Sequence, residues 1–304
     1  MQEMNVNDIG SHLAAEMLHE KRSDRRWRNI RFIAWFALIC FIVFKIFNIG
    51  GPSSVSKTKK YAALIRLDGM IAPDREFSAE MIVPLLRKAF ADKRATGVVI
   101  DINSPGGTPV QAAIIHDAII AYKKKYKKKV IVVGEDMLTS GAYYVAVAAD
   151  KIYVNPSTLT GSIGVIVKGF GFVDLMKKIG VERRVYVSGN DKDRLDPFLP
   201  QSESDLIKIR EVMGEVQANF VLAVAEGRKG KLHAKPEELF TGDFWSGQTA
   251  QKLGLVDNLG NLMDAMQAEF GTTEYKEFSG SPAFLKMLSG QFSSSLDAMF
   301  YTYL

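Results

Sequence analysis

The chain has 304 residues, of which 47% are hydrophobic, with a formal net charge of +5, one cysteine and four histidines. The apolar content excludes a disordered chain, and the length allows one large domain or two small ones. The single cysteine, Cys40, excludes intrachain disulfides and cysteine-rich zinc or iron–sulfur frameworks. So few cysteines and histidines argue against a metal site, and we expect none.

The positive charge is confined to two short runs. Residues 21–31 carry +5 and residues 123–129 (KKKYKKK) carry +6, so the rest of the chain is net acidic. Nucleic-acid sites interleave basic and aromatic side chains, but the second run holds only Tyr126, and we expect no nucleic-acid partner. The run follows a predicted helix over 110–122. We favour a solvated helix end, where lysines complement the helix dipole, over a contact with anionic lipid or polymer.

The first basic run precedes a hydrophobic stretch. Residues 32–44 are all apolar, and the stretch continues to residue 49 with only Lys45 and Asn48 interrupting it. These 18 residues just span a bilayer, and Lys45 is near enough to the end to snorkel. The alternative is a cleaved signal peptide, but about thirty residues precede the stretch and no small-x-small cleavage site follows it. We therefore predict one transmembrane anchor over 31–49.

The flanking charges predict the orientation of this anchor. Six basic residues precede the apolar stretch that begins at residue 32, whereas only Lys57, Lys59 and Lys60 follow it closely. The positive-inside rule then makes residues 1–30 a cytoplasmic segment and places the rest of the chain on the far side of the membrane. Residues 50–60 (GGPSSVSKTKK) have the composition of a linker.

After the linker, apolar strands alternate with helices. We expect strands over 61–67, 97–102, 129–133, 151–154 and 184–187, and helices over 78–92, 110–122, 140–149 and 204–226. This alternation predicts an α/β fold with a mostly parallel sheet. The last helix has an apolar stripe that predicts one buried face, made of Leu206, Ile209, Met213, Val216, Phe220 and Val224.

Two turns follow predicted strands at the edge where α/β proteins place their chemistry. Residues 103–107 (NSPGG) contain two glycines, which could expose backbone N–H groups to an oxyanion or could form an ordinary turn. Ser140 comes where a strand changes to a helix, beside the N–H of Gly141. A serine there could be a nucleophile, although by itself this pattern favours Thr139 or Ser140 as a helix N-cap.

A nucleophilic serine needs a base. His12 and His19 precede the predicted anchor, His116 lies within a predicted helix as a surface or core residue, and His233 lies in a loop. A neutral lysine can replace histidine if desolvation lowers its pKa, but spacing alone does not choose among the lysines.

The motifs themselves resemble a known family. Residues 103–107 (NSPGG), 139–150 (TSGAYYVAVAAD), 160–165 (TGSIGV) and 188–193 (SGNDKD) are similar, in this order, to motifs of the membrane-anchored signal peptide peptidases of serine peptidase family S49. Further matches to the closing segment of that family are 245–250 (WSGQTA) and 253–260 (LGLVDNLG). The resemblance covers residues 61–270 and is to the short form, in which one catalytic domain follows one anchor.

This resemblance implies a Clp-protease/crotonase-like fold and a Ser–Lys dyad without metal or cofactor. Ser140 would be the nucleophile, Lys192 the general base, and Gly107 and Gly141 the amide donors of the oxyanion hole. Related Clp peptidases have a histidine about 25 residues after the serine, which this chain lacks. The substrate groove would include Gly106, Thr160, Gly161, Ser162, Ile163 and Gly164.

The implied function is a serine endopeptidase of the bacterial inner membrane. Its catalytic domain would lie outside the cytoplasm and cleave apolar peptides such as remnant signal peptides. The family implies a homo-oligomer with active sites near subunit interfaces, where the lysine can come from a neighbouring subunit. The competing hypotheses are a catalytically inactive oligomeric membrane scaffold of the same fold and, with less support, a crotonase-type acyl-CoA enzyme.

Two features depart from the family or extend beyond its motifs. Asp191 and Asp193 flank Lys192 and would raise its pKa if they faced it, so we predict that both point away and that Lys192 acts only when buried in an assembled site. Residues 271–304 are a C-terminal extension with an apolar helical stripe, for docking on its own domain or for subunit or membrane contact. Its members are Leu285, Leu288, Phe292, Leu296, Met299 and Phe300.

Overall fold

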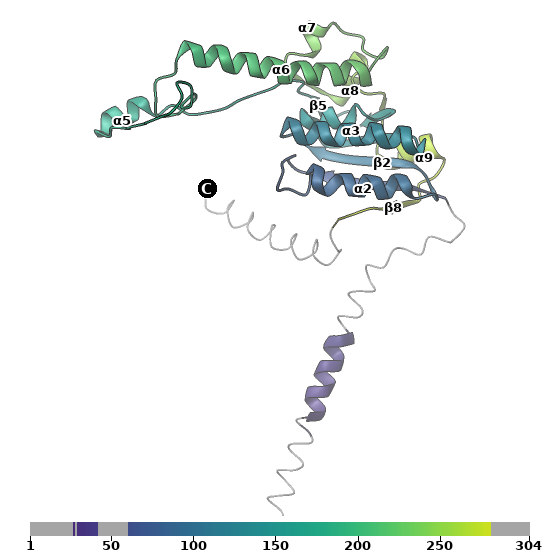
Figure 1. Ribbon diagram of the computed structural model, residues 1–304. Helices are drawn as coiled ribbons and strands as arrows, with labels where there is room; N and C mark the ends of the chain where they lie inside the picture. The colour runs from purple at the N-terminus through teal and green to yellow at the C-terminus, as the bar shows by residue number, and fades with distance from the viewer. Residues whose placement is uncertain (1–26, 28, 42–59, 281–304) are drawn as a thin grey trace, which may run out of the picture. The chain divides into compact units, whose positions relative to one another are not determined.

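A computed structural model describes residues 27, 29–41 and 60–280 of the chain (Figure 1). The chain divides into two compact units, of which residues 58–280 form the second, and each unit is considered by itself. Residues 29–41 are helical, but no helix in the described ranges is both long and apolar enough to cross a membrane. The predicted anchor continues over 42–49, and the apolar stripe of the tail lies within 281–304, so both extend outside the described residues.

A single eight-stranded sheet organises residues 60–280. The strand order is β6-β5-β3-β2-β1-β8, with β4 beside β3 and β7 beside β4. All pairings are parallel except that of β5 with β6. The strands are β1 (Tyr61–Asp68), β2 (Ala95–Ser104), β3 (Val130–Thr139), β4 (Lys151–Val154), β5 (Leu159–Gly161), β6 (Phe244–Ser246), β7 (Asn258–Leu259) and β8 (Tyr275–Glu277).

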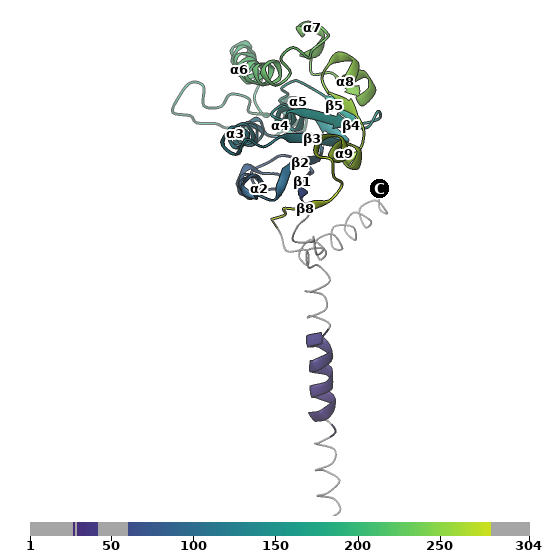
Figure 2. The same ribbon diagram turned by 90° about the vertical axis from the view of Figure 1, so that its right-hand side faces the viewer.

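Helices cover both faces of this sheet. Figure 2 shows α2 and α3 on one side of the central strands and α9 on the other. The helices are α2 (Ala79–Ala91), α3 (Pro109–Tyr126), α4 (Gly141–Ala146), α5 (Val173–Ile179), α6 (Glu203–Gly227), α7 (Pro236–Leu239), α8 (Gly247–Leu253) and α9 (Leu262–Phe270).

Burial on both faces explains the continuous apolar runs of the central strands. Residues 98–100 of β2 and 130–132 of β3 are fully buried, as expected for parallel strands between two helical layers. Under α9 the core consists of Ala62, Leu64, Val99, Ile131, Val133, Tyr153, Ala265 and Met266. The predicted α/β fold with a mostly parallel sheet is therefore confirmed, and it fits a Clp/crotonase-like architecture.

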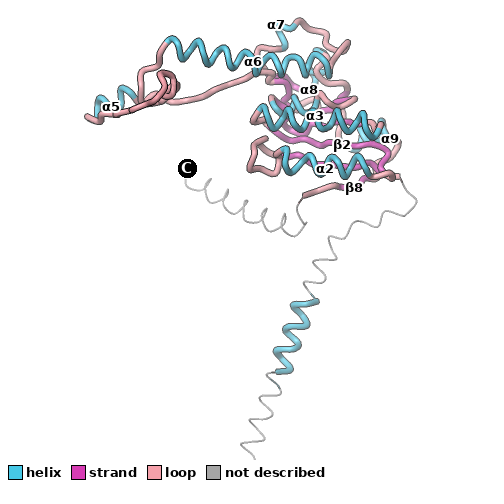
Figure 3. Tube along the Cα trace, viewed as in Figure 1, coloured by secondary structure: helices cyan, strands magenta, loops and turns pink. Residues whose placement is uncertain are grey.

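The strand predicted between β5 and α6 is wrong, and the burial predicted for α6 itself holds only in part. Residues 184–187 form no strand, and Tyr186 is 91% exposed, because no sheet edge lies beside them to satisfy their backbone. The apolar stripe of α6 is buried only toward its C-terminus, at Phe220 and Val224. Figures 1 and 3 show why: α5 and the N-terminal half of α6 extend away from the sheet.

The C-terminal end of α6 is fixed to the sheet by a buried arginine. Arg228 is 1% exposed, and its Nε and Nη2 donate to the carbonyl oxygen of Gly254 at 3.0 and 2.8 Å. Its Nη1 pairs with Asp257 at 2.6 Å, and Lys231 pairs with the same carboxylate at 2.8 Å. Burial alone would raise the pKa of Asp257, but Arg228 and Lys231 hold it below its usual value.

Removing this arginine should destabilise the domain. We expect Arg228→Met to lower the free energy of unfolding by about 3 kcal/mol, because Asp257 and the Gly254 carbonyl lose buried partners. The measurement is denaturant unfolding of the full-length chain followed by circular dichroism. Lys229→Met removes the same charge from the exposed next residue and is the matched control. Equal unfolding midpoints for the two variants would contradict the assigned role.

Candidate active site

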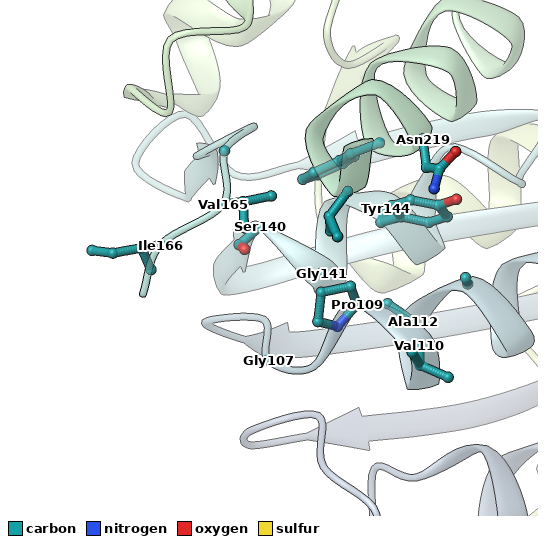
Figure 4. Close-up of a pocket in the computed structure, with 14 residues that line it drawn as sticks. Gly107, Pro109, Val110, Ala112, Ser140, Gly141, Tyr144, Val165, Ile166 and Asn219 are labelled. Atoms are coloured by element: carbon teal, nitrogen blue, oxygen red, sulfur yellow. The ribbon is translucent and has the colours of Figure 1, made fainter. Parts of the chain in front are cut away.

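A pocket of about 250 Å³ lies at the carboxyl ends of β2 and β3. Figure 4 shows Ser140 in it, between the turn at Gly107 and the segment that carries Val165 and Ile166. The other walls come from α3, α4 and α6, and most of their contributing side chains are apolar. They include Pro109, Val110, Ala113, Tyr144, Val216 and Phe220.

Ser140 has a backbone conformation that is rare for any residue other than glycine. Its φ of 53° and ψ of −125° turn the chain sharply from β3 into α4. Two backbone hydrogen bonds hold this turn: the Ser140 N–H donates to Gly161 O at 2.8 Å, and Ser140 O accepts from Tyr144 N–H at 3.0 Å. Such strain persists only where the surroundings impose it, and it is common at functional sites.

The hydroxyl of Ser140 is not used as a helix cap. Ser140 occupies the N-cap position of α4, but its side chain makes no capping hydrogen bond. The neighbouring Thr139 is buried and does not line the pocket. Of the two interpretations that the sequence left open, the structure thus favours a hydroxyl that is available to a substrate.

Two backbone amides beside Ser140 are free to bind an oxyanion. A Cβ built on Gly141 would lie 3.2 Å from Gly107 N, so the two turns touch. Within the described part of the chain, neither the Gly107 nor the Gly141 N–H donates a hydrogen bond. The Gly107 turn is held by its neighbours, since Gly106 O accepts from Ile71 N–H at 2.8 Å and Gly106 N–H donates to Ser104 Oγ at 3.1 Å. This arrangement can stabilise negative charge that develops next to Ser140.

Gly106 is required by steric packing against the serine. Its φ is +97°, and a Cβ there would lie 2.7 Å from both Ser140 Cβ and Gly141 N. A side chain at this position would push the serine turn and the amide turn apart. Gly106 therefore supports the site from behind, whereas the resemblance placed it in the substrate groove.

The segment after β5 forms one wall of the pocket. Gly164 lines the pocket, and Ser162 is fixed behind it by a 2.7 Å hydrogen bond from its N–H to Asp243 O. Thr160 and Ile163 are fully buried, and Gly161 packs so tightly on Trp245 that a Cβ would clash with the ring. Among the five residues from Thr160 to Gly164, the pocket lining thus includes only Gly164.

The α6 contribution to the pocket was missed from the sequence. Val216, Asn219 and Phe220 line the pocket, and the Phe220 ring packs on that of Tyr144 at 5.0 Å. The apolar stripe of this helix contains Val216 and Phe220, but the sequence pattern predicts only that the stripe is buried, not that it lines a pocket. Gln217 joins α6 to the segment after β5, because its Nε2 donates to Ile163 O at 3.2 Å.

Neither histidine of the described residues lines the pocket. His116 is buried in α3, where its Nδ1 contacts Asp117 at 2.8 Å and its ring packs edge-on against Tyr144. His233 is exposed, with its Nδ1 3.1 Å from Lys252 O. Among the described residues, the pocket lining thus offers no histidine as a base for Ser140.

Lys192 does not line the pocket of Ser140 either. It is exposed, in the segment between β5 and α6 that extends away from the sheet (Figure 1). Asp191 pairs with Arg194 at 2.7 Å, and within the described ranges no ion pair joins Lys192 to Asp191 or Asp193. The structure therefore brings together Ser140, Gly107, Gly141 and Gly164 but not the predicted dyad.

A serine on a strained strand-to-helix turn, beside two free amides and an apolar pocket, is the arrangement of a serine hydrolase. The sequence pattern of Peptidase family S49 matches residues 122–270. A Synechocystis protein named "Putative protease slr0021" is 34% identical over 215 residues, which cover 70% of this chain and 74% of that protein. The chain belongs to peptidase family S49, as its motifs predicted.

Two other relatives differ in how much they share with this chain. An Enterococcus faecium protein named "Putative signal peptide peptidase SppA" is 33% identical over 219 residues, covering 69% of this chain and 63% of that protein. A Brucella melitensis protein named "Na(+)/H(+) antiporter NhaA" is 47% identical over 187 residues, covering 62% of this chain. The matched region is 25% of the antiporter, so this chain spans a quarter of the length of that relative.

Two glycine substitutions separate backbone strain from steric contact at the site. Gly69 and Gly106 both have left-handed φ angles, +80° and +97°, but a Cβ on Gly69 would meet nothing within 4 Å. We expect Gly69→Ala to cost about 1–2 kcal/mol of stability through backbone strain alone, and Gly106→Ala to cost more, because its Cβ must also displace the serine turn. Only Gly106→Ala should slow the reaction of Ser140 with a fluorophosphonate, by about 100-fold, because it moves the oxyanion donors. Equal labelling rates for the two variants would contradict this geometry.

Proposed function

We propose that this chain is a serine endopeptidase that cleaves apolar peptides through an acyl-enzyme. The observation that carries the proposal is the unused hydroxyl of Ser140 beside the free amides of Gly107 and Gly141, in a chain of peptidase family S49. The apolar lining of the pocket supports apolar side chains as the preferred occupants.

In the proposed reaction, Ser140 Oγ attacks the carbonyl carbon of the scissile bond while its proton passes to the neutral Nζ of Lys192. The amides of Gly107 and Gly141 stabilise the oxyanion of the tetrahedral intermediate. The protonated lysine then gives its proton to the leaving amine, and a water molecule hydrolyses the acyl-enzyme by the same route.

This mechanism requires Lys192 to leave solvent, because an exposed lysine is protonated near neutral pH. The segment around it supports burial by a second copy of the chain. Helix α5 has no buried residue, and large apolar side chains of the segment and of α6 are exposed. They include Phe170, Leu175, Ile179, Val181, Leu195 and Ile207. We therefore propose a homo-oligomer in which Lys192 of one subunit meets Ser140 of its neighbour.

Mixing two inactive variants tests the source of the base. Ser140→Ala and Lys192→Ala should each lose at least about 1000-fold in peptide cleavage. If neighbours share a site, an equal mixture reassembled from subunits should regain about a quarter of the wild-type activity, since one site in four then holds both groups. Size-exclusion chromatography confirms that both variants assemble. A mixture that stays inactive would assign the base to the same chain or to another residue.

The pocket lining predicts substrate preference. Ala113→Leu places a larger side chain in the pocket, so cleavage after large apolar residues should fall by about tenfold or more relative to cleavage after alanine. Ala121→Leu, an exposed position farther along α3, is the matched control. The measurement is kcat/KM on paired fluorogenic peptides. An unchanged ratio in Ala113→Leu would show that this pocket does not receive the side chain before the scissile bond.

We further propose that residues 31–49 anchor the chain in the bacterial inner membrane, with residues 1–30 in the cytoplasm and the catalytic domain outside it. The basic residues before the apolar stretch support this orientation. Remnant signal peptides are then fitting substrates, in line with the name of the Enterococcus faecium relative. The exposed Lys192 also keeps one alternative open, an inactive oligomeric scaffold, which a failure of Ser140 to react with a fluorophosphonate would favour.

A further inference from the structure

Basic side chains gather at the edge of the sheet opposite Ser140. This amino edge consists of the starts of β1, β2 and β3 together with the carboxyl ends of α2 and α3, which run antiparallel to the strands (Figure 1). The exposed lysines at the amino edge are Lys60, Lys88, Lys93, Lys124, Lys125, Lys127 and Lys129.

Three acidic side chains near this edge already form ion pairs, and these pairs leave several of the exposed lysines without an acidic partner. Asp92 binds Lys276 at 3.3 Å, and Asp150 binds Lys123 at 2.8 Å. Glu269 binds Lys151 at 2.7 Å and also Lys129. Burial alone would raise the pKa of Glu269, but hydrogen bonds from Lys129, Lys151 and Tyr153 lower it to about 2.

The lysine run over 123–129 splits into two groups. Lys123, Lys128 and Lys129 have structural partners: Lys123 Nζ donates to Ala148 O at 2.8 Å, and Lys128 Nζ donates to Asp92 O. Lys124, Lys125 and Lys127 form no ion pair within residues 60–280. Contacts with other parts of the domain thus account for only half of the run.

A nucleic-acid partner is disfavoured by the aromatic residues nearby. Tyr122 and Tyr126 pack against Phe90, with ring centroids 5.7 and 6.3 Å apart. These rings are therefore held within the domain rather than presented for stacking on bases. The surface offers exposed ammonium groups alone, which suit phosphate groups that are arrayed in a plane.

We propose that the unpaired lysines of the amino edge bind the anionic headgroups of the bilayer, a proposal that rests on the anchor over 31–49. The chain enters this edge through Lys60, which directly precedes β1. Only residues 50–60 separate Lys60 from the anchor, a distance of at most about 40 Å when fully extended. Lysines at an anionic surface each contribute to binding, and the attraction falls off within a Debye length.

Lysine labelling in lipid nanodiscs tests this surface. The full-length chain is reconstituted in discs of phosphatidylcholine with or without 30% phosphatidylglycerol, and acetylation rates are read by mass spectrometry. Lys124, Lys125 and Lys127 should react about fivefold more slowly in the anionic discs, and 1 M salt should abolish the difference. Lys168 and Lys178, exposed in the segment between β5 and α6, are internal controls whose rates should not change. Equal rates in both discs would overturn the proposal.

A charge variant adds an independent readout. In K124Q/K125Q/K127Q, the lipid-dependent protection of Lys93 from acetylation should disappear, whereas K168Q/K178Q should keep it.

Fluorophosphonate labelling of Ser140 in the same discs tests the proposed peptidase activity separately from the lipid-binding surface. If the lysines are protected but Ser140 is not labelled, the proposed peptidase activity is overturned and the proposed lipid-binding surface stands. If Ser140 is labelled but the lysines are not protected, only the lipid-binding surface is overturned. If the chain fails to insert, adding vesicles of the two compositions to the purified chain repeats the same comparison.

Discussion

The close approach of two backbone turns is the constraint on which the rest of this site depends. The turn after β2 and the turn after β3 come near enough that no side chain fits at Gly106, and the amide of Gly107 lies next to Gly141. The parallel pairing of β2 with β3 sets this approach, because both turns then leave the same edge of the sheet. A buried, rigid sheet thus holds an exposed hydroxyl and two amide donors in a fixed relation, which electrostatic catalysis needs.

Helix α6 completes the walls of the pocket but supplies none of the groups proposed to react. Helix α6 covers the serine turn with Val216 and Phe220, while Arg228 ties its end to the carbonyl of Gly254. Gln217 connects the same helix to the segment after β5 that carries Gly164. Binding surface and catalytic turn therefore belong to different elements, so substrate preference can change through α6 without disturbing Ser140.

The local parts of this arrangement could be read from the sequence, and the long-range parts could not. The buried runs of β1, β2 and β3 and the turns at Gly106 and Ser140 have local signatures, namely apolar continuity and glycine beside serine. The stripe of α6 has a clear period, but a period does not say what covers it, and the N-terminal half of the stripe is only partly buried within residues 60–280. The strand predicted over 184–187 failed for a related reason, since strand formation depends on a neighbouring edge. Motif order predicts Lys192 as the base, but this stays a prediction, because the side chain is exposed and apart from the pocket of Ser140.

The exposure of Lys192 has a consequence for the cell if the proposed mechanism holds. A newly made single chain would carry its nucleophile and its exposed base apart. Such a chain would resemble a zymogen that needs no cleavage for activation, because under the proposed anchor and assembly the crowding of subunits in the membrane plane would replace proteolytic maturation. Activity would then rise more steeply than expression, and dilute subunits would be harmless to proteins that are still crossing the membrane.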